Sequence, residues 1–296
     1  MSGFQRSRFE LTLGGAKLRL GHETKIMGVL NVTPNSFSDG GCFMDPALAE
    51  IQAVRMEEEG AQLLDVGGES SKPGSKPVSA KEEIRRLRPV LKRLSRKIKI
   101  PVSVDTYKYE VARMALDEGA SMVNDIYALR GNARLARLIA RHKAGVVLMH
   151  MRGNPETMQN KIQYENLLME ISAYLKKAVR FALDAGIAAR SIVIDPGFGF
   201  GKTLEQNLKI LSHLDFFEKL KCPILVGLSR KSFIGNLLAA PVSGRLYGSL
   251  GAAAVAIQKG AHILRVHEVL PHRQMALLID RTKFVDFSRE EVTCAA

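Results

Sequence analysis

Short apolar, β-branched runs recur eight times along the chain, and most of them are followed by a helical pattern. They lie near residues 26–30, 62–66, 100–104, 121–126, 145–149, 191–194, 223–227 and 262–266. This alternation predicts parallel strands, because two parallel strands need a long crossover between them, which a helix supplies. Eight such units in 296 residues predict an α/β protein built as a (β/α)8 TIM barrel, for which about 250 residues is typical. An open, doubly wound sheet is the competing fold.

The whole chain, residues 1–296, is expected to form a single domain, because no Pro/Ser-rich linker, low-complexity tract or short-period repeat divides it. The segments FELTL and KLRL flank Gly14-Gly15, which predicts a β-hairpin over residues 8–20. The expected layout is therefore an N-terminal hairpin region at 1–25, the barrel at 26–268, and a C-terminal helix and tail at 269–296.

Several helix ends can be placed from the sequence. Asp45-Pro46 offers an N-cap followed by proline at the first helical position, and Ser79-x-x-Glu82 is typical of a capping box. Pro89 is expected to break or kink the helix that begins after Ser79. Three glycines are each expected to end a helix just before an apolar run, namely Gly60, Gly119 and Gly260.

Polar residues stand at the carboxyl ends of the eight runs. In order they are Asn31, Asp65 with Glu69, Asp105, Asn124 with Asp125, His150, Asp195, Ser229 with Lys231, and Arg265 with His267. In a parallel barrel these ends converge on one face, which is the face where such enzymes place their active sites. The position of these residues therefore favours the barrel over the open sheet and predicts a polar site at one mouth.

The composition, 46% hydrophobic and 25% charged, excludes a collagen-like, low-complexity or wholly disordered chain. No apolar run approaches the roughly 18 residues of a membrane span, and the first residues lack the apolar core of a signal peptide. Cys42, Cys222 and Cys294 form no C-x-x-C pair, so neither a disulfide framework nor a zinc knuckle is indicated. We therefore expect a cytoplasmic protein with no membrane partner.

Lys and Arg outnumber Asp and Glu by 43 to 30, and the net charge of +13 suggests an anionic partner. Residues 76–100 hold ten Lys or Arg against two Glu, a net +8. Apolar residues recur there at three- and four-residue steps, which places the charges on the outer face of a helix. A solvated basic face is favoured over a nucleic-acid or anionic-surface site, and no nucleic-acid partner is expected.

Arg265 and His267 are two residues apart at the end of the eighth run, so in a strand their side chains point the same way. Together they would make an anion clamp, with phosphate as a reasonable ligand because barrels often bind it near the last strands. The alternative is a structural salt bridge of Arg265 with Glu268 or with a neighbouring strand.

The segment DPGFGFGKT (195–203) does not fit a nucleotide-binding loop, because neither the phosphate-loop nor the G-x-G-x-x-G glycine spacing is met. What remains is Asp195 at a strand end, followed by a flexible glycine-rich loop that carries Phe198 and Phe200. Asp195 could accept two hydrogen bonds from an amidine-like ring edge while the aromatic rings cover a flat ligand.

Asp105, Asn124 and Lys231 add an acceptor, an amide that both donates and accepts, and a cation. With Asp195 they suit a planar nitrogen heterocycle that carries ring donors and a carbonyl. A metal cage is disfavoured because the histidines are scattered, although Mg²⁺ on a phosphate substrate remains open. For Asp105 or Asp195 taken singly, the alternative is a helix N-cap or a loop tie.

Eight segments carry a family resemblance, in order and at similar spacing, over residues 26–268. They are MGVLNVTPNSFSDGG (27–41), DVGGESSKPG (65–74), VSVDT (102–106), VNDI (123–126), LMHMRGNP (148–155), DPGFGFGK (195–202), VGLSRKSFIG (226–235) and GSLGAAAVAIQKGAHILRVHE (248–268). They resemble the dihydropteroate synthase family of sulfonamide targets. The resemblance implies a (β/α)8 barrel, usually a homodimer, that joins 6-hydroxymethyl-7,8-dihydropterin diphosphate to p-aminobenzoate and releases diphosphate in folate biosynthesis.

The resemblance also implies roles for single residues. The pterin-contacting positions are Asp105, Asn124, Asp195 and Lys231, with Met149 beneath the ring and Arg265 stacking on it. The diphosphate clamp is Asn31, Arg265 and His267, and Asn31 is also the Mg²⁺ contact. The p-aminobenzoate side is Phe37, Ser71, Pro73, Phe200, Ser229 and Lys231. The residues expected to take part in catalysis are Asp105, Asp195, Lys231, Arg265 and His267.

Two positions depart from the family pattern: Asn35 stands where the family has Asp, and Lys72 where it has Arg. The first change removes a charge, and the second replaces a bidentate fork by a point charge. Two alternatives to the enzyme are a non-catalytic paralogue that acts as a binding protein and a pterin-binding methyltransferase barrel. The methyltransferase would have no need of the Arg265-x-His267 pair or of the NVTP loop.

Overall fold

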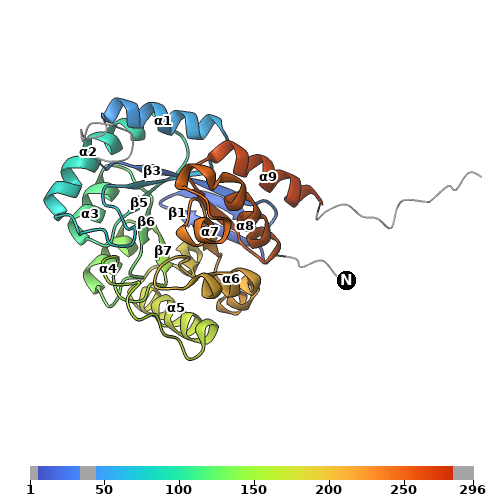
Figure 1. The fold of residues 1–296 in the computed structure, drawn as a ribbon. Coiled ribbons are helices and arrows are strands. Elements are labelled where there is room, and N and C mark those ends of the chain that lie inside the picture. Colours follow the sequence, from blue (N-terminus) through green and yellow to red (C-terminus); the bar gives the residue numbers. More distant parts are fainter. Residues whose placement is uncertain (1–5, 34–44, 283–296) are drawn as a thin grey trace, which may run out of the picture.

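A computed structural model describes residues 6–33 and 45–282, and its centre is a ring of parallel strands surrounded by helices (Figure 1). The strands of this ring are β3 (Lys25–Asn31), β4 (Leu63–Gly67), β5 (Val102–Asp105), β6 (Met122–Asp125), β7 (Gly145–Met149), β8 (Ile192–Asp195), β9 (Leu225–Val226) and β10 (Ile263–Val266). Each of the eight apolar runs forms one of these strands, so the prediction of strands is confirmed.

The strand order is β8-β7-β6-β5-β4-β3-β10-β9, with parallel pairing throughout. A parallel bridge between Ile194 and Ile224 joins β8 to the segment just before β9. The sheet therefore curls back on itself, and the predicted (β/α)8 barrel, not the open doubly wound sheet, is the fold.

The outer layer consists of helices that follow the strands around the ring. They are α1 (Pro46–Glu58), α2 (Ala80–Lys97), α3 (Tyr109–Asp117), α4 (Ala133–Arg141), α5 (Leu167–Asp184), α6 (Leu204–Ser212), α7 (Ser232–Leu238), α8 (Leu246–Gln258) and α9 (Val269–Thr282). Three short 3-10 turns, η1 (Ala189–Ser191), η2 (Leu214–Leu220) and η3 (Val242–Gly244), complete the connections. Within the described residues no helix has the length and apolar character needed to cross a membrane.

The helix ends agree with most of the sequence signals. Asp45 is the N-cap of α1, followed by Pro46, and its side chain accepts a hydrogen bond from the Ala47 amide. The Ser79 hydroxyl accepts a hydrogen bond from the Glu82 amide. The other half of the expected capping box differs, because the Glu82 carboxylate accepts hydrogen bonds from Arg85 and Arg86. The predicted helix-ending glycines have left-handed φ angles of 97°, 100° and 100°, at Gly60, Gly119 and Gly260.

The expected break at Pro89 is wrong, since α2 continues through this residue to Lys97. Proline removes the amide that would bond to the carbonyl of Arg85, four residues earlier. Both Pro89 and Arg85 are exposed, so water can reach that carbonyl and the helix tolerates the lost hydrogen bond.

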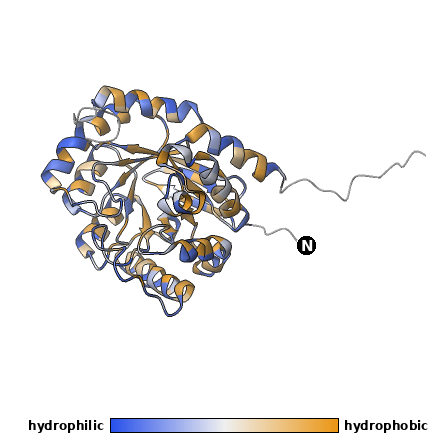
Figure 2. Ribbon diagram, in the orientation of Figure 1, coloured by the Kyte–Doolittle hydropathy of each residue, from blue (hydrophilic) through white to orange (hydrophobic). Residues whose placement is uncertain are grey.

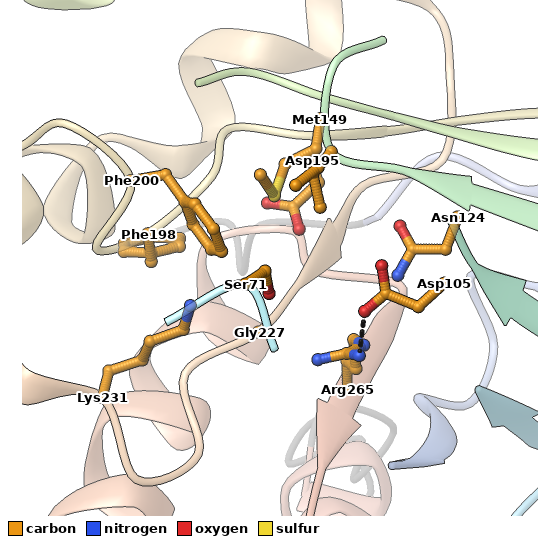
Figure 3. A pocket seen from close by; sticks show the side chains of 11 residues that line it. Ser71, Asp105, Asn124, Met149, Asp195, Phe198, Phe200, Gly227, Lys231 and Arg265 are labelled. Atoms are coloured by element: carbon orange, nitrogen blue, oxygen red, sulfur yellow. Dashed lines mark hydrogen bonds and ion pairs between the residues drawn. The ribbon is translucent and has the colours of Figure 1, made fainter. Parts of the chain in front are cut away.

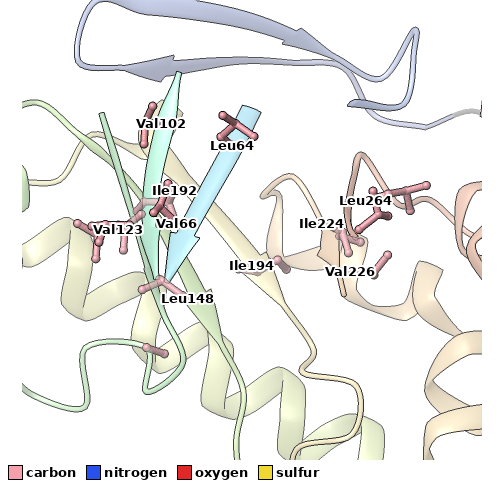
Figure 4. Packing of buried hydrophobic residues seen from close by; sticks show 14 of the residues in the cluster. Leu64, Val66, Val102, Val123, Leu148, Ile192, Ile194, Ile224, Val226 and Leu264 are labelled. Carbon is pink, nitrogen blue, oxygen red and sulfur yellow. The ribbon is translucent and has the colours of Figure 1, made fainter. Parts of the chain in front are cut away.

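The side chains of the strands alternate between the helical layer and the barrel interior. Those that face the helices are apolar and pack into the main core, as Figure 4 shows for Leu64, Val66, Val102, Val123, Leu148, Ile192, Ile194, Ile224, Val226 and Leu264. The helices are amphipathic, with apolar residues toward the sheet and hydrophilic residues outward (Figure 2). The helical layer thus buries one complete face of the ring.

An antiparallel hairpin of β1 (Phe9–Leu13) and β2 (Ala16–Leu20) forms, as the sequence predicts. It closes the barrel at the amino-terminal ends of the parallel strands. Its buried leucines form one cluster with the first inward-facing residues of the strands, namely Leu11, Leu13 and Leu20 with Met27, Leu63, Met122, Val147, Val193, Leu225 and Ile263. A side chain on Gly145 would lie 2.3 Å from Leu13 Cδ2, so β7 needs glycine where the hairpin enters.

The hairpin is tied to the end of the chain by a buried ion pair. Arg6 donates to Asp280 at 2.5 Å, to the hydroxyl of Thr24 at 2.7 Å and to the carbonyl of Ala261 at 2.8 Å. The second carboxylate oxygen of Asp280 accepts from the Thr24 amide at 2.5 Å. The ion-paired side chains are 2% and 3% exposed, so each charge depends on its partner in place of water.

We predict that Arg6→Ala lowers the free energy of unfolding by about 3–5 kcal/mol, because it leaves the Asp280 carboxylate buried without its cation. Denaturant unfolding followed by circular dichroism measures the change. The control is Lys17→Ala, which breaks the exposed Lys17–Glu10 pair on the same hairpin and is expected to leave the midpoint close to wild type. Equal midpoints for the two variants would contradict the assignment.

Candidate active site

The site is the second inward-facing layer of the barrel. Along each strand, the residue two positions after an apolar or small inward side chain points to the same side. These steps run from Leu63 to Asp65, Ser103 to Asp105, Met122 to Asn124, Val147 to Met149, Val193 to Asp195, Leu225 to Gly227 and Ile263 to Arg265. A ring of largely polar side chains therefore stands directly above an apolar floor.

One cavity at the mouth of the barrel collects these side chains (Figure 3). It is lined by Ser71, Asp105, Asn124, Ile126, Met149, Asp195, Phe198, Phe200, Gly227, Lys231 and Arg265. The six residues expected to contact a pterin all lie on its wall. Of the six expected on the p-aminobenzoate side, Ser71, Phe200 and Lys231 also line it.

The other expected residues lie at the edge of this cavity or elsewhere. Ser229 is buried beneath the mouth, where its hydroxyl faces His267, and Pro73 is exposed on the loop after β4. Asn31 and Asp105 lie on either side of Gly67, on the two strands that flank β4. A Cβ added to Gly67 would be 3.7 Å from the Asn31 amide oxygen and 3.8 Å from an Asp105 carboxylate oxygen. Phe37, and the departure at Asn35, lie outside the described residues.

Arg265 joins two carboxylates across the barrel. Its Nε donates to Asp65 at 2.6 Å and its Nη2 donates to Asp105 at 2.8 Å. Burial on its own would lower the pKa of Arg265, but the two carboxylates raise it, so this guanidinium stays charged. The salt bridge considered as the alternative for Arg265 therefore exists, with β4 and β5 rather than with Glu268.

Asp105 is the member of this cluster whose charge is least stable. Burial raises the pKa of Asp105 to about 7, against the pull of Arg265 and with the help of nearby Asp65. The helix N-cap alternative for Asp105 is wrong, since α3 has Lys108 as its N-cap residue. Asp105 thus presents a carboxylate that a cationic or hydrogen-donating ligand would stabilise.

Asp65 is the residue of the site to which the sequence assigned no role. Its Oδ2 accepts from Arg265 and also from the Asn124 amide nitrogen at 2.9 Å, while its Oδ1 is buried without a hydrogen-bond partner among the described residues. This carboxylate fixes which atom of Asn124 faces the cavity, because the amide nitrogen is engaged below it. The sequence signal that could have pointed to Asp65 is its position at a strand end, two residues after Leu63.

Asp195 and Lys231 form the opposite wall. One Asp195 oxygen accepts from the Gly197 amide at 2.7 Å, so this residue does act as a loop tie, and its other oxygen remains for a ligand. Burial raises the pKa of Asp195 to about 6 and lowers the pKa of Lys231 to about 8. The Lys231 ammonium lies 4.1 Å from the centre of the Phe200 ring, within the range of a cation–π contact.

The loop after β8 is buried, whereas the sequence suggested a flexible one. Lys202, 3% exposed, donates to the carbonyls of Gly197 and Phe200 at 2.7 and 3.0 Å and lies 3.0 Å from His150 Nδ1. The Asn207 side chain accepts from the Gly199 amide at 2.7 Å. Phe198 packs into the core against Phe233, so Phe200 is the more exposed of the two rings on this loop. Buried polar side chains thus replace water around the glycine-rich backbone.

His267 is held neutral. Its Nδ1 lies 2.9 Å from the Ser229 hydroxyl, which also donates to Glu268 at 3.2 Å. Burial, followed by the charges of Arg265, Arg230, Lys231 and Lys72, lowers the pKa of His267 to about 3. The predicted clamp therefore pairs a guanidinium already bound by two carboxylates with a neutral imidazole, so an incoming anion would compete with Asp65 and Asp105 for Arg265.

Comparisons with known proteins agree with this geometry. Residues 27–267 match the family model described as pterin binding enzyme. The chain is 43% identical to the dihydropteroate synthase of Synechocystis over 271 residues, which is 91% of this chain and 94% of the relative. Two solved dihydropteroate synthases superpose with TM-scores of 0.88 and 0.87. They are the Yersinia pestis enzyme with a sulfonamide drug, at 38% identity over 94% of this chain and 100% of that one, and the Xanthomonas albilineans enzyme with 4-aminobenzoic acid, at 39% identity over 95% and 100%.

The buried charge of Asp195 makes a prediction about stability. Its pKa in the folded chain, about 6, is above its ordinary value of 3.8, so the folded chain keeps a proton that the unfolded chain loses as the pH rises. Stability contributed by this group is therefore lost between about pH 4 and pH 6 and stays lower above pH 6. We predict that Asp195→Asn is more stable than wild type at pH 8, by on the order of 3 kcal/mol, with no difference at pH 3.5.

Urea unfolding at the two pH values tests this, and the control is the same substitution at an exposed position on α5, Asp184→Asn. A destabilised Asp195→Asn protein at pH 8 would mean that the carboxylate holds its loop more than its burial costs.

Proposed function

This chain belongs to the dihydropteroate synthase family of pterin binding enzymes, and from that premise we propose how its cavity condenses 6-hydroxymethyl-7,8-dihydropterin diphosphate with p-aminobenzoate. The products are 7,8-dihydropteroate and diphosphate. The observation that carries the proposal is the single cavity in which two carboxylates with raised pKa values, an amide and two cations surround an apolar floor. The similarities give no support to a methyltransferase or to a non-catalytic paralogue.

The pterin ring lies in the deep part of this cavity, above Met149. Asp195 accepts from the amidine edge of the ring through the oxygen that Gly197 leaves available. The Asn124 amide oxygen accepts from a ring N–H because its nitrogen is bound to Asp65. Lys231 donates to the ring carbonyl, and Phe200 beside it excludes water from this contact.

The buried carboxylates favour bond breaking before bond formation. The methylene carbon loses its bond to oxygen, and the electron pair leaves with diphosphate, so positive charge develops on the dihydropterin. Asp105 and Asp195 are poorly solvated anions in the free enzyme, and a cation between them relieves that cost. The two carboxylates are thus preorganised for the transition state rather than for the neutral ring.

The leaving diphosphate lies over Asn31, Arg265 and His267. Arg265 keeps part of its fork engaged by Asp65 and Asp105, so it acts as a fixed positive wall rather than a mobile clamp. The residues present fit Mg²⁺ only as a site shared with the substrate, since the described residues contain no group of three His, Cys, Asp or Glu that could hold a metal and Asn31 offers one amide oxygen. When bound, Mg²⁺ would neutralise charge on the diphosphate.

The aryl amine enters next to Phe200 and Lys231, beneath the loop that carries Ser71 and Pro73. Its nitrogen attacks the methylene carbon, forms the C–N bond and passes one proton to solvent. The amine is neutral before attack, so no strong general base is needed, and His267 with its lowered pKa is not required to serve as one.

A homodimer is the proposed assembly. Large apolar side chains are exposed along the neighbouring elements α7, η3 and α8, among them Leu237 (55%), Val242 (53%) and Tyr247 (84%). Apolar side chains exposed on elements that contact one another, as α7 does with η3 and α8, are typical of a subunit interface.

The test of the function is diphosphate release. Purified protein with Mg²⁺ and the pterin diphosphate is expected to release diphosphate in step with p-aminobenzoate consumption and to form dihydropteroate. Asp195→Asn is expected to bind the dihydropterin about 10- to 100-fold more weakly, since a charge-assisted hydrogen bond contributes about 1.5–3 kcal/mol. Wild-type protein that releases no diphosphate would overturn the proposal, and unchanged pterin binding by the variant would overturn the role of Asp195.

His267 gives a second prediction. A diphosphate placed beside its imidazole raises the pKa of His267 from about 3 toward its ordinary range, so binding takes up protons near pH 6. Calorimetry in buffers of different ionisation enthalpy measures this uptake for the pterin diphosphate and for the pterin alcohol. We expect uptake with the diphosphate alone, and its loss in His267→Ala together with a roughly tenfold weaker affinity for the diphosphate. Equal weakening of both ligands would assign His267 a structural role.

A further inference from the structure

A buried ionic cluster lies next to the catalytic cavity and takes no part in the steps above. Lys108 donates to Glu69 and to Glu83, each at 2.5 Å. The three side chains are 13%, 10% and 1% exposed in that order. Burial raises the pKa of Glu83, and within residues 6–33 and 45–282 one of its oxygens has no hydrogen-bond partner, so this cluster is costly to build.

The cluster closes the loop that carries Ser71 and Pro73. One Glu69 oxygen accepts from the amide of Val78, nine residues further on, at 2.7 Å, and the other accepts from the Tyr107 hydroxyl at 3.0 Å. A single carboxylate therefore pins both ends of segment 70–77, which projects outward with several exposed residues between. The Arg86 side chain holds the carbonyl of Gly68 at 2.9 Å and fixes the point where the loop begins.

The rest of the loop is held by lighter contacts. The Ser75 hydroxyl donates to the Ser70 hydroxyl at 3.0 Å, and the Gly74 amide donates to the carbonyl of Pro155 at 2.9 Å. Neither contact reaches the wall of the barrel that bears Asp105. Lys108, in contrast, stands three residues after Asp105 on the segment that leaves β5.

We propose that Glu69 is a positioning residue for the amine pocket, which acts through Lys108 and Tyr107 to hold Ser71 at the cavity wall. The inference rests on the proposed function. It adds that the end of β5, which supplies Asp105 to the pterin, also positions the loop that covers p-aminobenzoate. The deep pterin subsite, built on strands, does not depend on this brace.

The variant that tests this is Glu69→Gln, which keeps the shape of the side chain and one acceptor oxygen but loses the charge that binds Lys108. We expect the KM for p-aminobenzoate to rise at least fivefold, with the Kd of the pterin diphosphate, measured by calorimetry without the amine, within twofold of wild type. Tyr107→Phe removes only the 3.0 Å hydrogen bond and is expected to raise the same KM about twofold. The control is Glu50→Gln, which makes the same change at a more exposed ion pair, that of Glu50 with Arg93 between α1 and α2 at 3.0 Å, and is expected to leave both constants unchanged.

The loop can be observed directly, because the sequence contains no tryptophan. Lys76→Trp places a single fluorophore at an exposed loop position, and adding Glu69→Gln to it is expected to lower the fluorescence anisotropy of the loop. A lower melting temperature with an unchanged KM and unchanged anisotropy would reduce Glu69 to a structural residue, and a parallel rise in pterin Kd would place it in the pterin subsite. Either result leaves wild-type diphosphate release intact, whereas failure of that release would overturn the function itself.

Discussion

The site depends on the way a closed parallel barrel sorts its side chains. Each strand points alternate residues inward, so two residues that are two positions apart both face the interior. The first belongs to the apolar floor and the second to the polar ring. The ring therefore contains charges that water reaches poorly. Asp105 and Asp195 keep raised pKa values, and Arg265 remains charged because two carboxylates bind it. The stability of the empty enzyme is lowered at the positions where a cationic pterin is to be stabilised.

The two halves of the site differ in how firmly they are held. On the pterin side, Lys202 and Asn207 satisfy the backbone of the glycine-rich loop, and strands supply most of the remaining contacts. On the amine side, the loop after β4 is exposed and is anchored chiefly by one carboxylate. A rigidly held pterin subsite and a more adjustable amine subsite follow from this contrast. Lys72, where the family has Arg, lies on the adjustable side.

The sequence predicts the strands and the pterin residues well because both signals are local. Apolar runs mark the strands, and a polar residue at the end of a run marks the mouth, so Asp105, Asn124, Asp195 and Lys231 could be placed together before any contact was known. The role of Asp65 could not, because its partner Arg265 is 200 residues away and meets it only when the ring closes. The burial of Lys202 was also hidden, since a lysine beside glycines suggests a solvent-exposed loop. Pro89 misled because the rule that proline ends a helix takes no account of exposure: on the outer face of α2, water can reach the carbonyl of Arg85 that loses its hydrogen bond.

The ion pair of Arg6 and Asp280 joins residues 274 positions apart, and β10 pairs with β3, near the start of the ring. During synthesis, the hairpin and the first strand of the ring emerge long before their partners. Neither can complete its contacts until nearly the whole chain has left the ribosome, because β10 and Asp280 are made late. Closing loops of this length costs chain entropy, and until β10 arrives the outer edge of β3 stays unpaired in the growing chain. The enzyme therefore depends on α9 to anchor the segment that leads into its hairpin, and a chain released before β10 would present an open sheet with an edge prone to aggregation.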